Sequence, residues 1–206
     1  MEQRTPEWFE VRRGKVTASH MRDVTSKGRG SQPSKTRESY MTKLAVERLT
    51  GNVGDNFTSQ FMQDGIDREP DAISNYEFYK NVDVDQIGFV DHFKIKMSGA
   101  SPDGLIGEEG LIEVKCPKAT THFEYLKNKT IPSEYIKQMD WQLACTGRQW
   151  CDFVSFHPDF PEELQLLIIR HKRDDQAIKE LEEAVQIFLD DLDKTVAELT
   201  DMRTAA

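Results

Sequence analysis

Two acidic residues and a lysine are spaced so that a fold could bring them around one metal ion. Asp103 lies in the turn-forming sequence Ser-Pro-Asp-Gly, and Glu113 and Lys115 follow in Leu-Ile-Glu-Val-Lys. Side chains two residues apart on a strand project to the same face, so Glu113 and Lys115 should point the same way. Turn residues between apolar runs predict strands at 104–107 and 111–116. Pairing of these strands would place Asp103 near Glu113.

This combination suits metal-assisted hydrolysis of a phosphodiester bond. Magnesium prefers oxygen ligands in octahedral geometry and usually takes one or two carboxylates with waters and phosphate oxygens. Asp103 and Glu113 supply carboxylates, and the backbone carbonyl of Val114 could supply another oxygen. Lys115 could orient the attacking water, favour its hydroxide form and offset charge in the transition state. Glu69, on a helix-like segment, could add an acid. We therefore expect Mg²⁺ as cofactor, with Mn²⁺ as a substitute.

The ordinary alternative is that Glu-x-Lys marks a solvated strand face, since short motifs of this kind are common. The alternating residues Ile112, Val114 and Cys116 are apolar, which indicates that the other face of this strand is buried. The two charged residues would then face inward on a core-like element, and burying charge is costly without a purpose. The sequence therefore favours a functional site.

A second group of candidates lies in the N-terminal segment Trp-Phe-Glu-Val-Arg-Arg-Gly-Lys-Val-Thr-Ala-Ser. It combines an aromatic ring at Trp8, a guanidinium at Arg12 and hydroxyls at Thr17 and Ser19. Arginine presents planar, paired donors that match phosphate oxygens. The segment therefore predicts a phosphate pocket, and the alternative is plain surface charge at the end of a helix.

In this order along the chain, the motifs resemble the phage lambda exonuclease family, from Trp8 to about Phe156. The resemblance rests on the N-terminal segment, on Ser-Pro-Asp-Gly and on Glu-Val-Lys-Cys-Pro. It implies an α/β fold with a restriction-endonuclease-like core, in which helices flank a central mixed β-sheet. It also implies a magnesium-dependent exonuclease that degrades one strand of linear double-stranded DNA from its 5′ end, releasing mononucleotides and leaving a 3′ single strand. The implied partners are double-stranded DNA ends with a 5′-phosphate, further copies in a ring-shaped homotrimer and a single-strand annealing protein of phage-type recombination.

The resemblance also implies roles for individual residues. The implied metal ligands are Asp103, Glu113 and the carbonyl of Val114; the further catalytic residues are Lys115, Glu69 and Gln138; and the contacts to DNA or its 5′-phosphate are Trp8, Arg12, Thr17, Ser19 and Ser101. The segment 28–37 and the stretch after Arg170 match no motif of the family.

Charge and length set outer limits. A chain of 206 residues is most simply one nuclease domain, 1–206. Its net charge of −9 is divided unevenly, because residues 1–50 hold 11 Lys and Arg against 6 Asp and Glu, or +5, which leaves −14 for the rest. A basic N-terminal region on an acidic body is compatible with phosphate binding at one surface.

Cysteine content and hydropathy exclude other classes. The three cysteines lack paired metal-ligand spacing and are too few for a four-cysteine iron–sulfur cluster, so core thiols are expected. No apolar run approaches the roughly 20 residues of a membrane span, and the N-terminus lacks the apolar region of a signal peptide. We expect no membrane contact and a cytoplasmic setting in a bacterial host, for a phage or prophage protein.

Periodicity and turn signals predict the elements that position these residues. Helices are expected at 6–11, 38–49, 58–79 with a kink or break near Pro70, 120–129, 133–145 and 174–200; further strands are expected at 81–86, 88–91, 94–100, 150–157 and 164–171. Pro132-Ser133 should cap the helix that Gly147 ends. Residues 25–37 are predicted as a flexible basic loop that meets DNA or merely connects. The amphipathic C-terminal helix should pack its apolar stripe in the core and expose its acidic face to solvent or to a partner.

Two other functions stay open. A site-specific endonuclease on the same core would need groove-reading elements, and no basic recognition helix stands out. A non-catalytic DNA-end-binding protein of recombination would be expected to have lost at least one of Asp103, Glu113 and Lys115.

Overall fold

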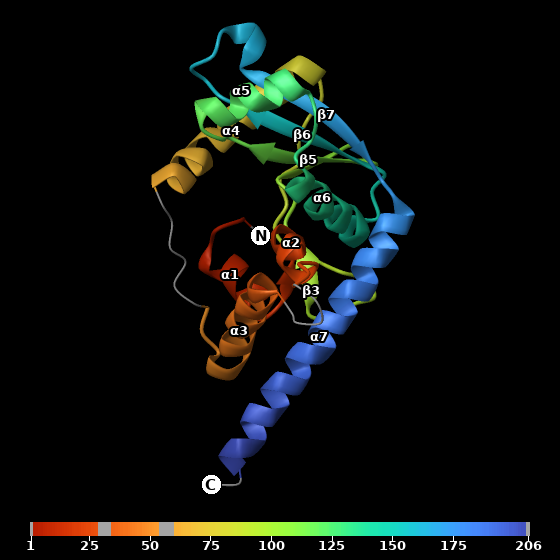
Figure 1. Ribbon diagram of the computed structural model, residues 1–206. Helices are drawn as coiled ribbons and strands as arrows, with labels where there is room; N and C mark the ends of the chain where they lie inside the picture. Colours follow the sequence, from red (N-terminus) through yellow and green to blue (C-terminus); the bar gives the residue numbers. More distant parts are fainter. Residues whose placement is uncertain (1, 29–33, 54–59, 205–206) are drawn as a thin grey trace.

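In the computed structural model, which describes residues 2–28, 34–53 and 60–204, the chain forms two β-sheets with helices packed around them (Figure 1). The larger sheet has the order β4 (Gly104–Ile106), β5 (Gly110–Lys115), β6 (Trp150–Phe156) and β7 (Leu166–Lys172). It is mixed, because β5 and β6 are parallel while β4 and β7 each run antiparallel to their neighbour. The expected central mixed sheet flanked by helices is confirmed.

The smaller sheet was not foreseen. It joins β1 (Val16–Thr17), β3 (Ser98–Ala100) and β2 (Val90–Asp91) in that order, with β1 parallel to β3. The predicted strand over 81–86 is wrong, since this stretch makes only an isolated bridge between Asp85 and Leu105. The strand predicted over 94–100 is shortened to its last three residues, because Met97 has a positive φ of 59° that turns the backbone immediately before β3.

The described helices are α1 (Pro6–Arg12), α2 (Met21–Val24), α3 (Lys35–Thr50), α4 (Gln60–Lys80), α5 (Ala119–Asn128), α6 (Ser133–Thr146) and α7 (Asp175–Thr204). Short 3-10 turns cover Ala18–His20 and Glu162–Leu164. Helix α3 begins where Ser34 Oγ accepts the N–H of Arg37 at 3.0 Å, so residues 35–37 of the predicted basic loop are helical. Residues 29–33 of that loop lie outside the described residues.

Two details of helix punctuation differ from expectation. Helix α4 continues through Pro70. Proline has no N–H to donate to the carbonyl four residues earlier, but Pro70 is exposed, so water can bond to that carbonyl instead. Of the expected kink or break, the break is therefore wrong. Pro132 occupies the N-cap of α6 and makes no side-chain capping bond, so the expected cap is also wrong. Gly147 does end α6, in a left-handed conformation with φ 72°.

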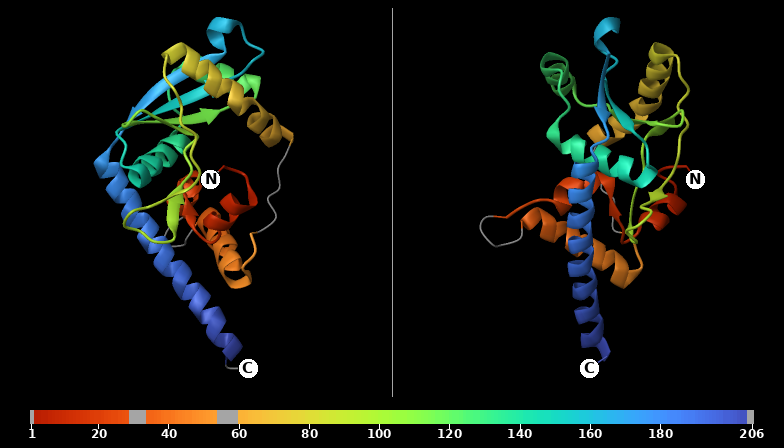
Figure 2. Two further views of the ribbon diagram at one scale, coloured as in Figure 1. Left: turned by 180° about the vertical axis from the view of Figure 1, so that it is seen from behind. Right: turned by 90° about the vertical axis from the view of Figure 1, so that its right-hand side faces the viewer.

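Helices on opposite faces of the larger sheet divide its side chains into two clusters. Ile112, Val114 and Val154 point to α4 and form one apolar cluster with it. On the other face, Leu111 and Phe153 belong to the main core, together with side chains of α3, α6 and α7. Glu113 lies between Ile112 and Val114 in β5 and therefore faces α6. Figures 1 and 2 show α6 between the larger sheet and the small sheet around β3.

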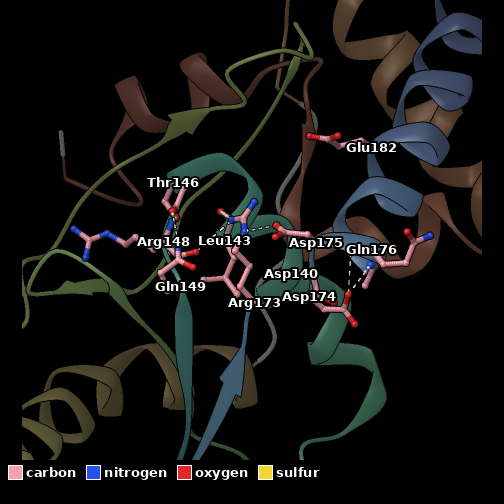
Figure 3. A network of polar contacts seen from close by, with 12 residues as sticks. Asp140, Leu143, Thr146, Arg148, Gln149, Arg173, Asp174, Asp175, Gln176 and Glu182 are labelled. Carbon is pink, nitrogen blue, oxygen red and sulfur yellow. Dashed lines mark hydrogen bonds and ion pairs between the residues drawn. The ribbon is translucent and has the colours of Figure 1, made fainter.

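Two arginines join the C-terminal end of α6 to the β4–β5 hairpin and to α7, and Figure 3 shows both side chains and the contacts of Arg173. Arg173 Nη1 donates to the carbonyl of Leu143 at 2.6 Å, and its Nε pairs with Asp175 at 2.6 Å. Arg148 Nη1 donates to the carbonyls of Gly107 and Gly110 at 2.7 and 2.9 Å. The β4–β5 hairpin is thus fixed to the helix that packs under Glu113.

The long helix α7 starts at the sheet, passes alongside α3 and carries the C-terminal end of the chain away from the rest of the molecule (Figures 1 and 2). Its apolar stripe, which includes Val185, Phe188 and Leu192, is buried. Neither α7 nor any other helix in the described ranges has an apolar stretch that could cross a membrane. Of the cysteines, Cys145 and Cys151 are buried as expected, whereas Cys116 is partly exposed.

Candidate active site

The β4–β5 hairpin brings Asp103 to the part of β5 that lacks a strand partner on one side. Pairing of the two strands stops at Gly104 and Ile112. Beyond that point Asp103 Oδ2 accepts the N–H of Val114 at 2.7 Å. The N–H and C=O of one residue point to the same side of a strand. The carbonyl of Val114 therefore also faces Asp103.

Glu113 is held from three directions. Its side chain is only 1% exposed. Gln138 Nε2 donates to Oε1 and Gln142 Nε2 donates to Oε2, each at 2.6 Å. Lys115 Nζ forms an ion pair with Oε1, as expected for residues two apart on one strand face. The structure thus gathers Asp103, Glu113, Lys115 and Gln138 in one place.

Gln142 is a site residue that the sequence motifs do not identify, because helical spacing alone places it on a core-facing side of α6. It is fully buried, and its amide Nε2 donates to the carboxylate of Glu113. The signal that could have found it is its spacing of four from Gln138, which places both amides on the same helix face. Tyr135 is another residue that the motifs do not identify, and the centre of its ring lies 5.1 Å from Lys115 Nζ.

The electrostatics of the group are dominated by burial and by its two carboxylates. Burial, followed by the charge of Glu113, raises the pKa of Asp103 well above its ordinary value, and Lys115 offsets only part of this. Burial lowers the pKa of Lys115, but the charges of Glu113 and Asp103 outweigh it, so that the net pKa is raised. Lys115 is therefore an ammonium group at neutral pH.

These donors fit a small divalent cation. Two carboxylates that repel one another at a desolvated position would both be stabilised in their charged forms by a cation between them. In the described ranges no three His, Cys, Asp or Glu side chains are grouped to hold a metal. The available set is two carboxylates and the carbonyl of Val114, which is the sparse oxygen set that Mg²⁺ accepts together with waters.

Glu69 lies on α4 at the edge of the same site. Its charge also raises the pKa of Asp103. The carboxylate pairs with Arg4 at 2.5 Å. Next to Arg4, Gln3 Nε2 donates to the carbonyl of Pro102 at 2.8 Å, and this bond holds the N-terminal segment beside Asp103.

The N-terminal candidates form a pocket around Ser101. Trp8 Nε1 and Arg12 Nη1 both donate to Ser101 Oγ, at 2.9 and 3.0 Å, and the guanidinium stacks 3.9 Å above the ring of Trp8. Burial lowers the pKa of Arg12 to about 10. No carboxylate in the described part of the chain forms an ion pair with Arg12, so this half-buried cation is available to an anion.

The two predicted hydroxyls have different positions. Ser19 is exposed and lines the pocket. Thr17 is only 5% exposed and does not line it, although its Oγ1 lies 3.3 Å from Ser19 Oγ. Thr17 N–H also donates to the hydroxyl of Tyr40 at 3.2 Å. Direct contact of Thr17 with DNA is therefore not favoured, and its hydroxyl is instead placed to orient Ser19.

One cleft of about 530 Å³ is lined by residues of the N-terminal pocket and by residues near the candidate metal site. Its lining includes Trp8, Arg12, Ser19, Ser101, Glu69, Val114, Lys115, Tyr135 and Gln138. The pocket around Arg12 and Ser101 therefore opens into the same cleft as Lys115 and the Val114 backbone, whereas Asp103 lines a neighbouring hollow that shares Gln3, Arg4 and Glu69 with this cleft.

Comparison with known proteins relates the chain to one domain family and to several individual proteins. Residues 7–149 match the YqaJ-like viral recombinase domain family. The alkaline exonuclease LHK-Exo from Laribacter hongkongensis is 43% identical, with a TM-score of 0.92 over 98% of this chain and 99% of that one, and it has also been solved in complex with dAMP. A phage related exonuclease from Haemophilus somnus 129PT shares the fold at 16% identity, with a TM-score of 0.74 over 90% of this chain and 96% of that one. The uncharacterised protein R354 of Acanthamoeba polyphaga mimivirus is 24% identical over 168 residues, which are 75% of this chain and only 29% of that protein.

Proposed function

Because the chain belongs to the YqaJ-like viral recombinase family, we propose that it degrades one strand of linear double-stranded DNA from its 5′ end. Its relationship to an alkaline exonuclease at 43% identity over nearly the whole chain makes it a nuclease. The observation that carries the proposal is the shared cleft, in which the pocket of Arg12 and Ser101 opens beside Lys115 and the Val114 backbone. Such a cleft can hold the end of a strand and a scissile phosphate together.

Asp103, Glu113 and the Val114 carbonyl would hold Mg²⁺, which when bound lowers the pKa of a water and stabilises charge on phosphate oxygens. Lys115 places an ammonium group where negative charge increases in the transition state. Gln138 and Gln142 keep the Glu113 carboxylate in one orientation through both of its oxygens. A carboxylate that is already held in one orientation needs little reorganisation during the reaction.

Recognition of the strand end would fall to the N-terminal pocket. A 5′-phosphate can accept from the guanidinium of Arg12 and from the hydroxyls of Ser19 and Ser101. The ring of Trp8 can stack on a terminal base, since every base presents a π-face. Because no described carboxylate forms an ion pair with Arg12, a phosphate would supply a directly bonded counter-charge.

We further propose the finer features that the family resemblance implies. These are release of mononucleotides, a 3′ single strand passed to a single-strand annealing protein in phage-type recombination, a homotrimeric ring, and action in the cytoplasm of a bacterial host. Glu69 would assist the metal site, and for this it must exchange its present ion pair with Arg4 for a contact with water or cation.

Digestion of end-labelled DNA tests the proposal. Linear duplexes that differ only in a 5′-phosphate or 5′-hydroxyl, and a closed circular duplex, are incubated with Mg²⁺. We expect mononucleotides from the 5′-labelled strand, faster attack on phosphorylated ends and no attack on the circle. Asp103→Ala should abolish hydrolysis but retain binding. Arg12→Ala should lower the preference for phosphorylated ends, with Arg22→Ala as an exposed arginine control. Cleavage of the circle, or release of the 3′ label first, would overturn the proposal.

A further inference from the structure

A turn at residues 12–15 separates the helix that carries Trp8 and Arg12 from the strand that leads to Ser19. Arg12 and Lys15 close it through an N–H to carbonyl bond of 3.0 Å. Arg13, with φ −54° and ψ 125°, and Gly14, with φ 65°, take the two central positions. These values describe a type II turn, which requires a positive φ at its third position and therefore favours glycine there. Arg12 is thus the first residue of the turn, and β1 and Ser19 follow it.

Two consecutive side chains at the end of α3 hold both backbone polar groups of Gly14. Glu47, which is 5% exposed, accepts the N–H of Gly14 at 2.8 Å. Arg48 Nε donates to the carbonyl of Gly14 at 2.9 Å. The approach is close, since a Cβ on Gly14 would lie 2.6 Å from Arg48 Cγ. The turn is therefore fixed in position as well as in shape.

Arg48 also connects this turn to α7. Its Nη1 forms an ion pair with Asp193, in the part of α7 that passes alongside α3. The side chain of Arg48 is 14% exposed and that of Asp193 is 68% exposed. A second ion pair, Arg37 with Asp191 at 2.7 Å, joins the same two helices with similar exposures of 16% and 53%. This second pair makes no contact with Gly14 among the described interactions.

Glu47 has a further effect on the pocket. Burial lowers the pKa of Arg12, and the charge of Glu47 acts in the opposite direction. Glu47 is therefore close enough to influence the guanidinium electrostatically as well as through the backbone.

We propose that Glu47 and Arg48 are positioning residues for recognition of the 5′-phosphate, which they control by holding the Gly14 turn that carries Arg12. Through the ion pair of Arg48 with Asp193, selectivity for the phosphorylated end also depends on α7. The inference rests on the proposed function, since it assumes that Arg12 receives the phosphate. It assigns a role to the C-terminal helix that its apolar stripe alone does not suggest.

Binding measured without turnover tests this. Fluorescence anisotropy in EDTA gives the affinity of the full chain for short duplexes with a 5′-phosphate or a 5′-hydroxyl. Glu47→Leu and Arg48→Gln should each lower the ratio of the two affinities by about three- to tenfold, which corresponds to the loss of one hydrogen bond. Glu47→Gln keeps an acceptor oxygen for the Gly14 N–H but loses the charge, so its ratio should lie closer to that of the parent than to that of Glu47→Leu. Asp193→Asn should lower the ratio by a smaller factor.

The matched controls are Arg37→Gln and Asp191→Asn, which remove an equivalent ion pair between α3 and α7 and should leave the ratio unchanged. The inference is overturned if Arg48→Gln and Arg37→Gln behave alike, or if the variants weaken binding of both duplexes equally. If Glu47→Leu fails to fold, the comparison of the Arg48 and Arg37 variants still decides. A parent protein without any phosphate preference would instead contradict the pocket in the proposed function.

Discussion

Replacing Gln142 by leucine tests how α6 holds the carboxylate of Glu113. Gln142 is fully buried and is the one described donor to Oε2, whereas Gln138 is partly exposed and shares Oε1 with Lys115. Loss of a hydrogen bond to a buried charged group costs about 1.5–3 kcal/mol. Water and Lys115 can replace much of the hydrogen bonding that Gln138 supplies to Oε1, so loss of the Gln138 amide should lower the free energy of unfolding by only about 0.5–1.5 kcal/mol.

The two variants should therefore differ in thermal stability. A difference of roughly 1–2 kcal/mol, at about 2–4 °C per kcal/mol for a chain of this size, predicts that Gln142→Leu melts about 2–8 °C below Gln138→Leu. Thermal unfolding of the metal-free proteins, followed by circular dichroism, measures this. Gln186→Leu, on the exposed face of α7, is the matched control for the chemical change and should melt near the parent.

Cation affinity gives a second, independent measurement. Partners that orient a metal ligand typically contribute about 10- to 100-fold to metal affinity. Calorimetric titration with Mn²⁺ should therefore show weaker binding by Gln142→Leu than by the Gln186 control. Equal melting temperatures for the Gln142 and Gln138 variants, together with unchanged Mn²⁺ affinity, would refute the reasoning.

Two further predictions concern stability. Asp103→Asn should stabilise the metal-free protein at pH 8. The pKa of Asp103 is higher in the folded protein than in the unfolded chain, so above the unfolded pKa the folded state binds more protons. The stability of the parent protein therefore falls as the pH rises through this range, whereas that of Asp103→Asn does not. Parallel melting profiles of the two proteins from pH 4 to 8 would contradict this. Gly110→Ala should cost about 1–3 kcal/mol, since its Cβ would lie 2.2 Å from the ring of Trp150, which stacks on Arg170. Denaturant unfolding measures the loss, and an unchanged midpoint would show that the ring moves freely.

The sequence predicts the fold where local pattern and turn chemistry agree. Alternating apolar residues around Glu113 and the turn before Gly104 predict the hairpin, and the structure has it with the register that returns Asp103 to β5. The ordered motifs also identify the lambda exonuclease family, and this is confirmed by a 43% identical alkaline exonuclease of the same fold. The nuclease class follows from that relationship, whereas the roles of single residues stay predictions.

What the sequence does not reveal depends on long-range partners. The small sheet pairs Val16–Thr17 with residues near position 98, and strands of two or three residues carry no periodicity to detect. Gln142 resembles a core position because helical spacing shows which face a residue occupies but not which polar group meets it. The ion pair between Arg4 and Glu69 joins positions 65 residues apart, so no local pattern indicates it.

The place of β7 at one end of the larger sheet has a consequence for solubility. In the described chain β7 pairs with β6 alone, so its other side presents backbone groups that could template a strand of a second molecule. The apolar half, Leu166–Ile169, is followed by the basic residues Arg170 and Lys172, and charged residues that flank an apolar strand disfavour such pairing. Asp152, deep in β6, keeps Arg170 in place through two bonds of 2.7 and 2.9 Å. A buried carboxylate therefore helps to hold a basic side chain in place on this edge strand.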